Sequence, residues 1–222
     1  MQESKDKTLR DLVYFPVFFN IVALGVTGLS FTLLPGLMSD YAQMSFVIYA
    51  GVFLAEILLV LILVGRLRKA GMSIRGLLTF DRETRWLRAI AVFAALNVLF
   101  IAYIWVALWI GYITPFSGLN LFQVVFFILL LPLAAGIVEE LAFRGYLIEV
   151  MLKKGLAENR VVLYSAISFA FIHGFFLVDK IIMTFLFGLI AGYYYVKERN
   201  LPVLIVAHIV VDVVTFGMTT IM

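Results

Sequence analysis

The hydrophobic positions of the sequence fall into seven long runs, separated by short stretches that carry polar residues, proline and glycine. A helix needs about 20 mostly apolar residues to cross the hydrocarbon core of a bilayer. The runs extend over Leu12–Leu34, Met44–Val64, Ala89–Ile113, Leu121–Leu152, Val161–Leu177, Ile181–Val196 and Val203–Met222. We therefore predict an all-α fold, a polytopic transmembrane helix bundle of about seven crossings that encloses an intramembrane polar cavity.

The composition agrees with a membrane protein. Of the residues, 64% are hydrophobic and 14% are charged, and the mean hydropathy is +1.09, whereas a soluble domain is nearer half apolar and a quarter charged. The absence of cysteine excludes disulfides and thiolate catalysis. We interpret residues 1–222 as one membrane domain, in which 1–120 form the N-terminal helices and a cytoplasmic loop and 121–222 form a core that carries the candidate chemistry.

The basic residues follow the predicted crossings. All but two of the 17 lysines and arginines lie in the N-terminal tail and in every second connection, the exceptions being Lys180 and Arg144. The positive-inside rule then predicts a cytoplasmic N-terminus and an external C-terminus. The first apolar run is longer than the hydrophobic part of a typical signal peptide, so we expect it to be retained. The net charge of +3 gives no reason to expect nucleic acid as a partner. We expect membrane lipid as a partner, and a bacterial plasma membrane as the location.

Ionisable side chains inside these apolar runs are the strongest pointer to function. A charge near the centre of a bilayer costs roughly 2.5 kcal/mol or more, so each such group calls for a partner or a function. Six of them lie in three of the last four runs: Glu139, Glu140, Arg144, His173, His208 and Asp212. At about 1.5 Å per residue, Glu139, His173 and Asp212 lie about 20, 18 and 14 Å from the predicted cytoplasmic ends of their helices. Three separate helices therefore carry polar groups at compatible depths.

Helical spacing indicates which of these groups pair. Glu140 and Arg144 are four residues apart, so they face the same way and can form an ion pair, which leaves Glu139 the less committed carboxylate. His208 and Asp212 have the same spacing. A carboxylate beside a neutral imidazole can act as a general base, and a polar pair can stabilise an oxyanion. Because an ionised Asp212 cannot donate a hydrogen bond, it must either be protonated or act by orienting His208.

The motifs formed by these residues resemble those of a known family. Glu139–Arg144 reads EELAFR and fits an EExxxR motif, and Phe169–His173 reads FAFIH and fits FxxxH. His208–Asp212 reads HIVVD and fits HxxxN, with aspartate in place of asparagine. Together and in this order they resemble the CPBP family of intramembrane proteases, which includes the CAAX prenyl endopeptidases and Abi-type proteins linked to bacteriocin immunity. The resemblance covers roughly Leu121–Met222.

The resemblance implies a role for each matched position. Glu139 would activate the attacking water with the assistance of His173, and His208 and Asp212 would line the oxyanion side. The function implied is an intramembrane endopeptidase acting on membrane-embedded, lipid-modified or leader-bearing peptides, so we expect a peptide or membrane-protein substrate as a partner.

Three further residues are expected to support the site. The resemblance implies that Glu140 and Arg144 brace it. Phe169 lies one turn before His173, and we expect its ring to pack there. Glu56, in the second run, fits none of the motifs. It could line the cavity or belong to a second site, and the sequence does not distinguish the two.

Other interpretations stay open. A non-catalytic membrane scaffold or bacteriocin-immunity protein could use the same cavity for binding, and a transporter could use the acidic and imidazole groups as a proton relay. The transporter is less favoured because the chain shows no paired halves with matching breaks. We expect no cofactor. The alternative is a Zn²⁺ ion held by Glu139, His173 and His208 with one position open, although the sequence contains no HExxH motif.

Overall fold

The structure, a computed structural model, describes residues 2–79, 85–174 and 178–221. These residues form helices and no strand, which confirms the predicted all-α class. The long elements are α1 (Gln2–Leu33), α2 (Tyr41–Lys69), α4 (Trp86–Trp109), α8 (Glu158–Ile172), α9 (Val178–Glu198) and α10 (Leu201–Ile221). The short helices η1 (Pro35–Ser39) and α3 (Ile74–Leu77) lie on either side of α2 in the sequence. Residues Leu121–Lys153 form one further long run, built from five consecutive segments.

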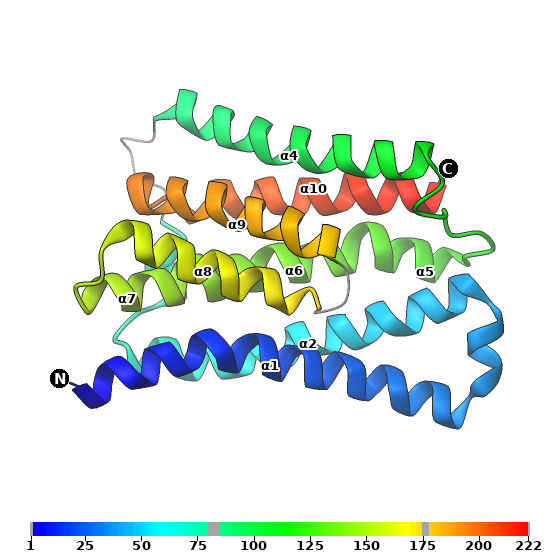
Figure 1. Ribbon diagram of the computed structural model, residues 1–222, viewed down its shortest axis with the longest axis horizontal. Helices are drawn as coiled ribbons and strands as arrows, with labels where there is room; N and C mark the ends of the chain where they lie inside the picture. The colour runs from blue at the N-terminus through cyan, green and yellow to red at the C-terminus, as the bar shows by residue number, and fades with distance from the viewer. Residues whose placement is uncertain (1, 80–84, 175–177, 222) are drawn as a thin grey trace.

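The helices lie side by side along one axis of the molecule, with the two chain ends at opposite ends of the bundle (Figure 1). The pair α1 and α2 forms one side, and α10 packs between α4 and α6. The hairpin of α8 and α9 covers the centre, where α8 also contacts α1. The arrangement therefore places the middle of the fourth run between α2 and α10.

Six of the described helices are long and apolar enough to span a membrane. The predicted crossing Val161–Leu177 appears as α8, which has 15 residues and is therefore about 22 Å long, shorter than the roughly 30 Å hydrocarbon core. Its predicted end, Leu177, lies outside the described residues, as does Met222. The helix stops at His173, and Gly174 follows with φ +105°, a conformation that favours glycine. The end of α8 therefore brings His173 into the interior of the bundle.

The fourth run is not a uniform α-helix. It passes through α5 (Leu121–Val125), the π-helical η2 (Phe126–Leu130), α6 (Leu131–Glu140), the π-helical η3 (Leu141–Ile148) and α7 (Glu149–Lys153). Proline removes a backbone donor and clashes with the preceding turn. Pro132 is the second residue after η2, where the Leu131 N–H bonds to the Phe126 carbonyl. The wider π-helical turn accommodates the proline. Wide turns of this kind are frequent at functional sites, and here η3 begins directly after Glu140.

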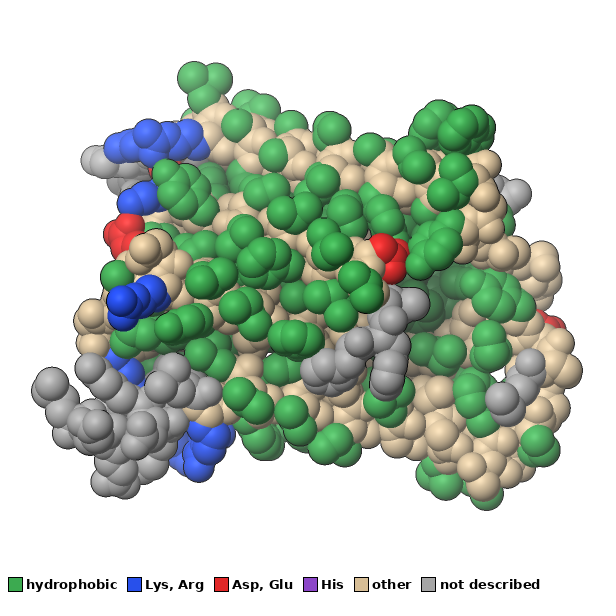
Figure 2. Space-filling view, viewed as in Figure 1, with side chains coloured by type: hydrophobic (Ala, Val, Ile, Leu, Met, Phe, Trp, Pro, Cys, Tyr) green, Lys and Arg blue, Asp and Glu red, His purple; other side chains and the backbone are tan. Residues whose placement is uncertain are grey.

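The surface has the pattern expected of a protein embedded in lipid. Figure 2 shows hydrophobic side chains over most of this face, with Lys and Arg side chains gathered at one end of the bundle. That end holds the beginning of α1 and the connections that follow α2, α7 and α9 (Figure 1). Large side chains such as Leu61, Leu87 and Trp109 are more than half exposed, as expected for contact with acyl chains. The protein is thus an integral membrane protein, while the cytoplasmic placement of the N-terminus stays a prediction.

A close approach of α6 and α10 positions the polar residues of both helices. A Cβ atom added at Gly136 would lie 2.5 Å from the Ile209 Cγ1 atom and 3.1 Å from the Ile209 backbone nitrogen. Both distances are too short, so this contact requires glycine. Glu139 and Glu140 follow Gly136 by one turn, which brings them against the turn of α10 that carries His208.

We predict that Gly136→Ala lowers the melting temperature of the purified protein by several degrees, because overpacking of a helix contact costs roughly 1–3 kcal/mol. Gly28→Ala in α1 is the matched control, since nothing lies within 4 Å of its Cβ position and alanine favours a helix. Thermal unfolding in detergent measures both. Equal melting temperatures for the two variants would contradict the close contact.

Candidate active site

The predicted acidic and imidazole groups meet in the centre of the bundle. Glu139 and Glu140 come from the end of α6, His173 follows α8, and His208 and Asp212 lie one turn apart on α10. The Glu139 Oε2 atom is 3.9 Å from His173 Nε2 and 3.7 Å from His208 Nε2. The Asp212 Oδ2 atom is also 3.7 Å from His208 Nε2. The structure therefore gathers all four predicted catalytic residues around one point, while their roles stay a prediction.

Glu140 links this group to Arg144. Its Oε1 atom accepts a hydrogen bond from Arg144 Nη1 at 2.7 Å and lies 3.0 Å from His208 Nδ1. Arg144 and Glu140 have no exposed side-chain surface. A buried ion pair needs further hydrogen bonds to offset its desolvation, and His208 supplies one of them. The ion pair expected from the spacing is present, and it also holds the imidazole of His208.

The hydrogen bonds of the two imidazoles determine which nitrogen faces Glu139. The His173 Nδ1 atom is 3.1 Å from the Phe169 carbonyl oxygen, and a carbonyl can only accept, so Nδ1 carries the proton. The His208 Nδ1 atom faces a carboxylate in the same way and donates to Glu140. Both rings therefore direct Nε2 at Glu139 Oε2, an oxygen that has no hydrogen-bond partner among the residues that the structure describes. The separations exceed those of a direct hydrogen bond.

Phe169 packs beneath the polar group, as the sequence predicts. The Arg144 guanidinium carbon lies 4.3 Å from the centre of its ring, a cation–π contact that helps to stabilise a buried cation. The same ring meets the imidazole of His173 edge-on, with centroids 5.0 Å apart. Phe169 thus fixes the positions of both side chains.

Two further residues lie beside the site: Phe187, which sequence reasoning missed, and Glu56, whose place it left open. The ring centroid of Phe187, on α9, is 4.7 Å from that of His208, but a phenylalanine in an apolar run gives no signal. Glu56 lies on α2, is fully buried, and is within hydrogen-bonding reach of Glu139. The sequence did carry a signal for Glu56, a carboxyl group in the middle of a crossing, but no spacing rule connects α2 to α6.

One carboxylate and two imidazoles are a donor set that suits zinc. In the part of the chain that the structure describes, however, no group of three or more His, Asp or Glu side chains has the arrangement of a metal site. The Nε2 atoms of His173 and His208 lie 3.9 and 3.7 Å from Glu139 Oε2, separations that a water molecule can bridge. Binding of zinc by Glu139, His173 and His208 is tested by the activity of the protein with and without a chelator.

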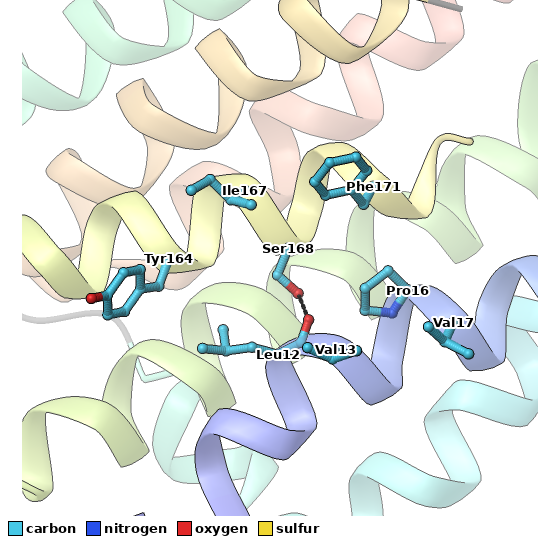
Figure 3. A pocket seen from close by; sticks show the side chains of 8 residues that line it. All are labelled: Leu12, Val13, Pro16, Val17, Tyr164, Ile167, Ser168 and Phe171. Carbon is cyan, nitrogen blue, oxygen red and sulfur yellow. Dashed lines mark hydrogen bonds between the residues drawn. The ribbon is translucent and has the colours of Figure 1, made fainter. Parts of the chain in front are cut away.

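An apolar cavity lies apart from this group, between α1 and α8 (Figure 3). Its volume is 260 Å³, and its lining includes Leu12, Pro16, Ile167 and Phe171. The hydroxyl group of Ser168 donates to the Leu12 carbonyl oxygen at 2.5 Å. The only other hydroxyl group in the described lining is that of Tyr164, and no carboxyl group or imidazole lines the cavity, so it offers no chemistry for hydrolysis.

Comparison with known families agrees with the geometry. Residues 120–214 match the family described as type II CAAX prenyl endopeptidase Rce1-like. The resemblance to the CPBP intramembrane proteases is confirmed. The Rce1-like region contains all six of the ionisable residues singled out in the last four apolar runs, whereas α1, α2 and α4 lie outside it. No curated protein and no solved structure gives a match. The Rce1-like match supports a CAAX-type intramembrane protease at the level of the family.

We predict that Arg144→Met strongly destabilises the protein, because removing one partner of a buried ion pair costs roughly 3–5 kcal/mol. The double variant Glu140→Gln/Arg144→Met should recover much of that loss, since a glutamine carbonyl oxygen still accepts from His208. Thermal unfolding of the purified variants measures both effects. A double variant no more stable than Arg144→Met would show that the unpaired Glu140 charge is not the cause.

Proposed function

We propose that the protein is an intramembrane endopeptidase in which Glu139 activates water for attack on a peptide bond. The observation that carries this proposal is the orientation of one oxygen. In the described part of the chain, Glu139 Oε2 has no hydrogen-bond partner, and it faces the Nε2 atoms of His173 and His208 at 3.9 and 3.7 Å. Separations of this size between polar atoms fit a single bridging water molecule.

In the proposed mechanism, Glu139 takes up a proton from water and later releases it, as the hydrogen bonds of the site allow. A water held by Glu139 Oε2 and the lone pair of His173 Nε2 gives its proton to Glu139 as its oxygen attacks the carbonyl carbon. The resulting tetrahedral intermediate carries a negative oxygen. Its collapse breaks the C–N bond, and Glu139 returns the proton to the leaving nitrogen. The products are a carboxylic acid and an amine, and Glu139 is again ionised.

His208 is placed to stabilise the negative oxygen. Carboxyl groups of Glu139, Glu140 and Asp212 lie 3.0–3.7 Å from its ring nitrogens, and their charges favour an imidazolium, whose Nε2 can donate a hydrogen bond to an oxyanion. In this proposal Asp212 acts through His208, and the 3.7 Å separation between Asp212 Oδ2 and His208 Nε2 supports that role for the aspartate at the asparagine position of the motif. Asp212 need not donate.

The location of the site supports a proposal for the substrate class. The reacting groups lie among helices long and apolar enough to span a membrane, and a peptide must enter from the lipid or the membrane interface to reach them. We propose a membrane-embedded, lipid-modified or leader-bearing peptide as the substrate, in line with the CAAX prenyl endopeptidase description of the matched family. The alternative function, a membrane scaffold or an immunity protein, predicts that a peptide binds at the same group of residues without being cleaved.

We predict that Glu139→Gln abolishes cleavage while leaving the fold intact, because the amide has nearly the same shape and cannot accept the proton from water. Glu158→Gln is the matched control, since Glu158 pairs with Lys197 in a half-exposed ion pair. Mass spectrometry of membrane peptides from cells with wild type, Glu139→Gln and Glu158→Gln at equal expression measures the result. Peptides that require the wild type and persist with Glu158→Gln support hydrolysis. Identical peptide sets in all three would overturn it in favour of the scaffold.

A second prediction separates the water mechanism from the zinc alternative. If Glu139 acts directly, cleavage by the purified protein continues after exhaustive dialysis against a chelator, and the protein carries no stoichiometric metal. The measurement is the rate of product formation with and without chelator, together with elemental analysis. Loss of activity that Zn²⁺ restores would instead assign Glu139, His173 and His208 as metal ligands.

A further inference from the structure

The carboxyl group of Glu56 lies beside the candidate active site, although Glu56 is outside the Rce1-like region 120–214. Glu56 lies at the middle of α2, has no exposed surface, and neither of its oxygens has a hydrogen-bond donor among the described residues. A buried polar group without a partner costs roughly 1–3 kcal/mol, and an ionised one costs more. Leu59 and Leu63, which share its side of α2, are fully buried apolar residues. Packing gives no reason for a glutamate at this position.

The neighbours of Glu56 are themselves acidic. Its side chain lies within hydrogen-bonding reach of Glu139 and interacts electrostatically with Asp212. Two carboxylates cannot hydrogen-bond to each other, because both only accept. Two carboxyl groups that share a buried site keep one proton between them, since like charges so close cannot both ionise. The contact between Glu56 and Glu139 therefore requires that one of them donates.

The surroundings of the two groups decide which one donates. Glu139 directs Oε2 at the imidazoles of His173 and His208, and the positive charge of Arg144 also acts on it. Glu56 faces only carboxyl groups among the described residues that interact with it. The negative charge is therefore more stable on Glu139, and the proton belongs on Glu56.

We propose that Glu56 is a positioning residue of the active site, whose protonated carboxyl group donates a hydrogen bond to Glu139 and holds Glu139 Oε2 toward the attacking water. This inference rests on the proposed function. It also assigns α2 a part in the chemistry, although α2 lies outside the Rce1-like region. A carboxylate of Glu139 held at both oxygens has fewer rotamers available, which keeps the reacting oxygen in the geometry that attack requires.

Two substitutions of similar length separate donation from packing. Glu56→Gln keeps a donor, because its amide N–H group can bond to Glu139. Glu56→Met keeps the length and loses the donor. Glu56→Met also leaves an oxygen of Glu139 without its donor, which is destabilising, so the activity of both variants is measured at a temperature well below the lower of their two melting temperatures. Loss of activity in that variant then reports on the site rather than on the fold.

The experiment uses full-length protein with both variants, with Glu139→Gln and wild type beside them, and measures the wild-type-dependent membrane peptides at matched expression. We expect the amount of product from Glu56→Gln to lie within about threefold of wild type. Glu56→Met should lose at least about tenfold, which corresponds to about 1.4 kcal/mol in the activation barrier. Glu139→Gln should give no product. Melting temperatures of the purified variants are recorded in parallel.

The other outcomes are decisive. Full activity of Glu56→Met beside an inactive Glu139→Gln overturns the role of Glu56 and leaves the proposed function standing. Equal losses in Glu56→Gln and Glu56→Met overturn the hydrogen-bond donation. Products that survive in Glu139→Gln overturn the proposed function itself, and with it the inference about Glu56.

Discussion

The cost of placing charge in a low-dielectric interior governs the centre of this bundle. Arg144 and Glu140 are both fully buried and 2.7 Å apart, and each would be strongly destabilising without the other. Their pairing fixes the orientation of η3, and the remaining capacity of Glu140 fixes His208. A buried ion pair therefore determines where the imidazole of His208 points, so that the stability of the bundle and the geometry of the candidate site depend on the same two side chains.

The helices around this pair are adapted to it in different ways. Gly136 lets α10 approach α6 closely enough for His208 to reach Glu140, and α8 ends inside the bundle, where His173 can face Glu139. Phe169 and Phe187 surround the polar atoms with aromatic rings. These rings keep the surroundings dry, which strengthens every electrostatic interaction within them, while their faces offset part of the charge of Arg144.

Much of this arrangement could be predicted from the sequence. The apolar runs gave the helices and their order, and the i,i+4 spacings gave the pair of Glu140 and Arg144. The meeting of Glu139, His173 and Asp212 followed from their compatible depths, and the order of the three motifs added His208. The short length of α8 was missed because its apolar run continues past Gly174, whose conformation ends the helix. The contact of Glu56 with Glu139 depends on how α2 rotates against α6, which no local pattern encodes.

The π-helical segments could not be predicted from the sequence either, because a π turn forms from the same apolar residues as an α turn. It differs only in holding about one residue more per turn. This difference gives η3 an unusual sensitivity to length. Loss of a single amino acid between 141 and 148 could be absorbed by tightening the helix to ordinary α geometry, without breaking the rod or exposing backbone to lipid. The helix beyond the deletion would keep its rotation, because a π turn holds one residue more than the α turn that replaces it. A deletion between Glu140 and Arg144 would instead move the guanidinium group from four residues after its carboxylate to three, so such a protein could still insert into the bilayer while its internal charge pair took a different geometry.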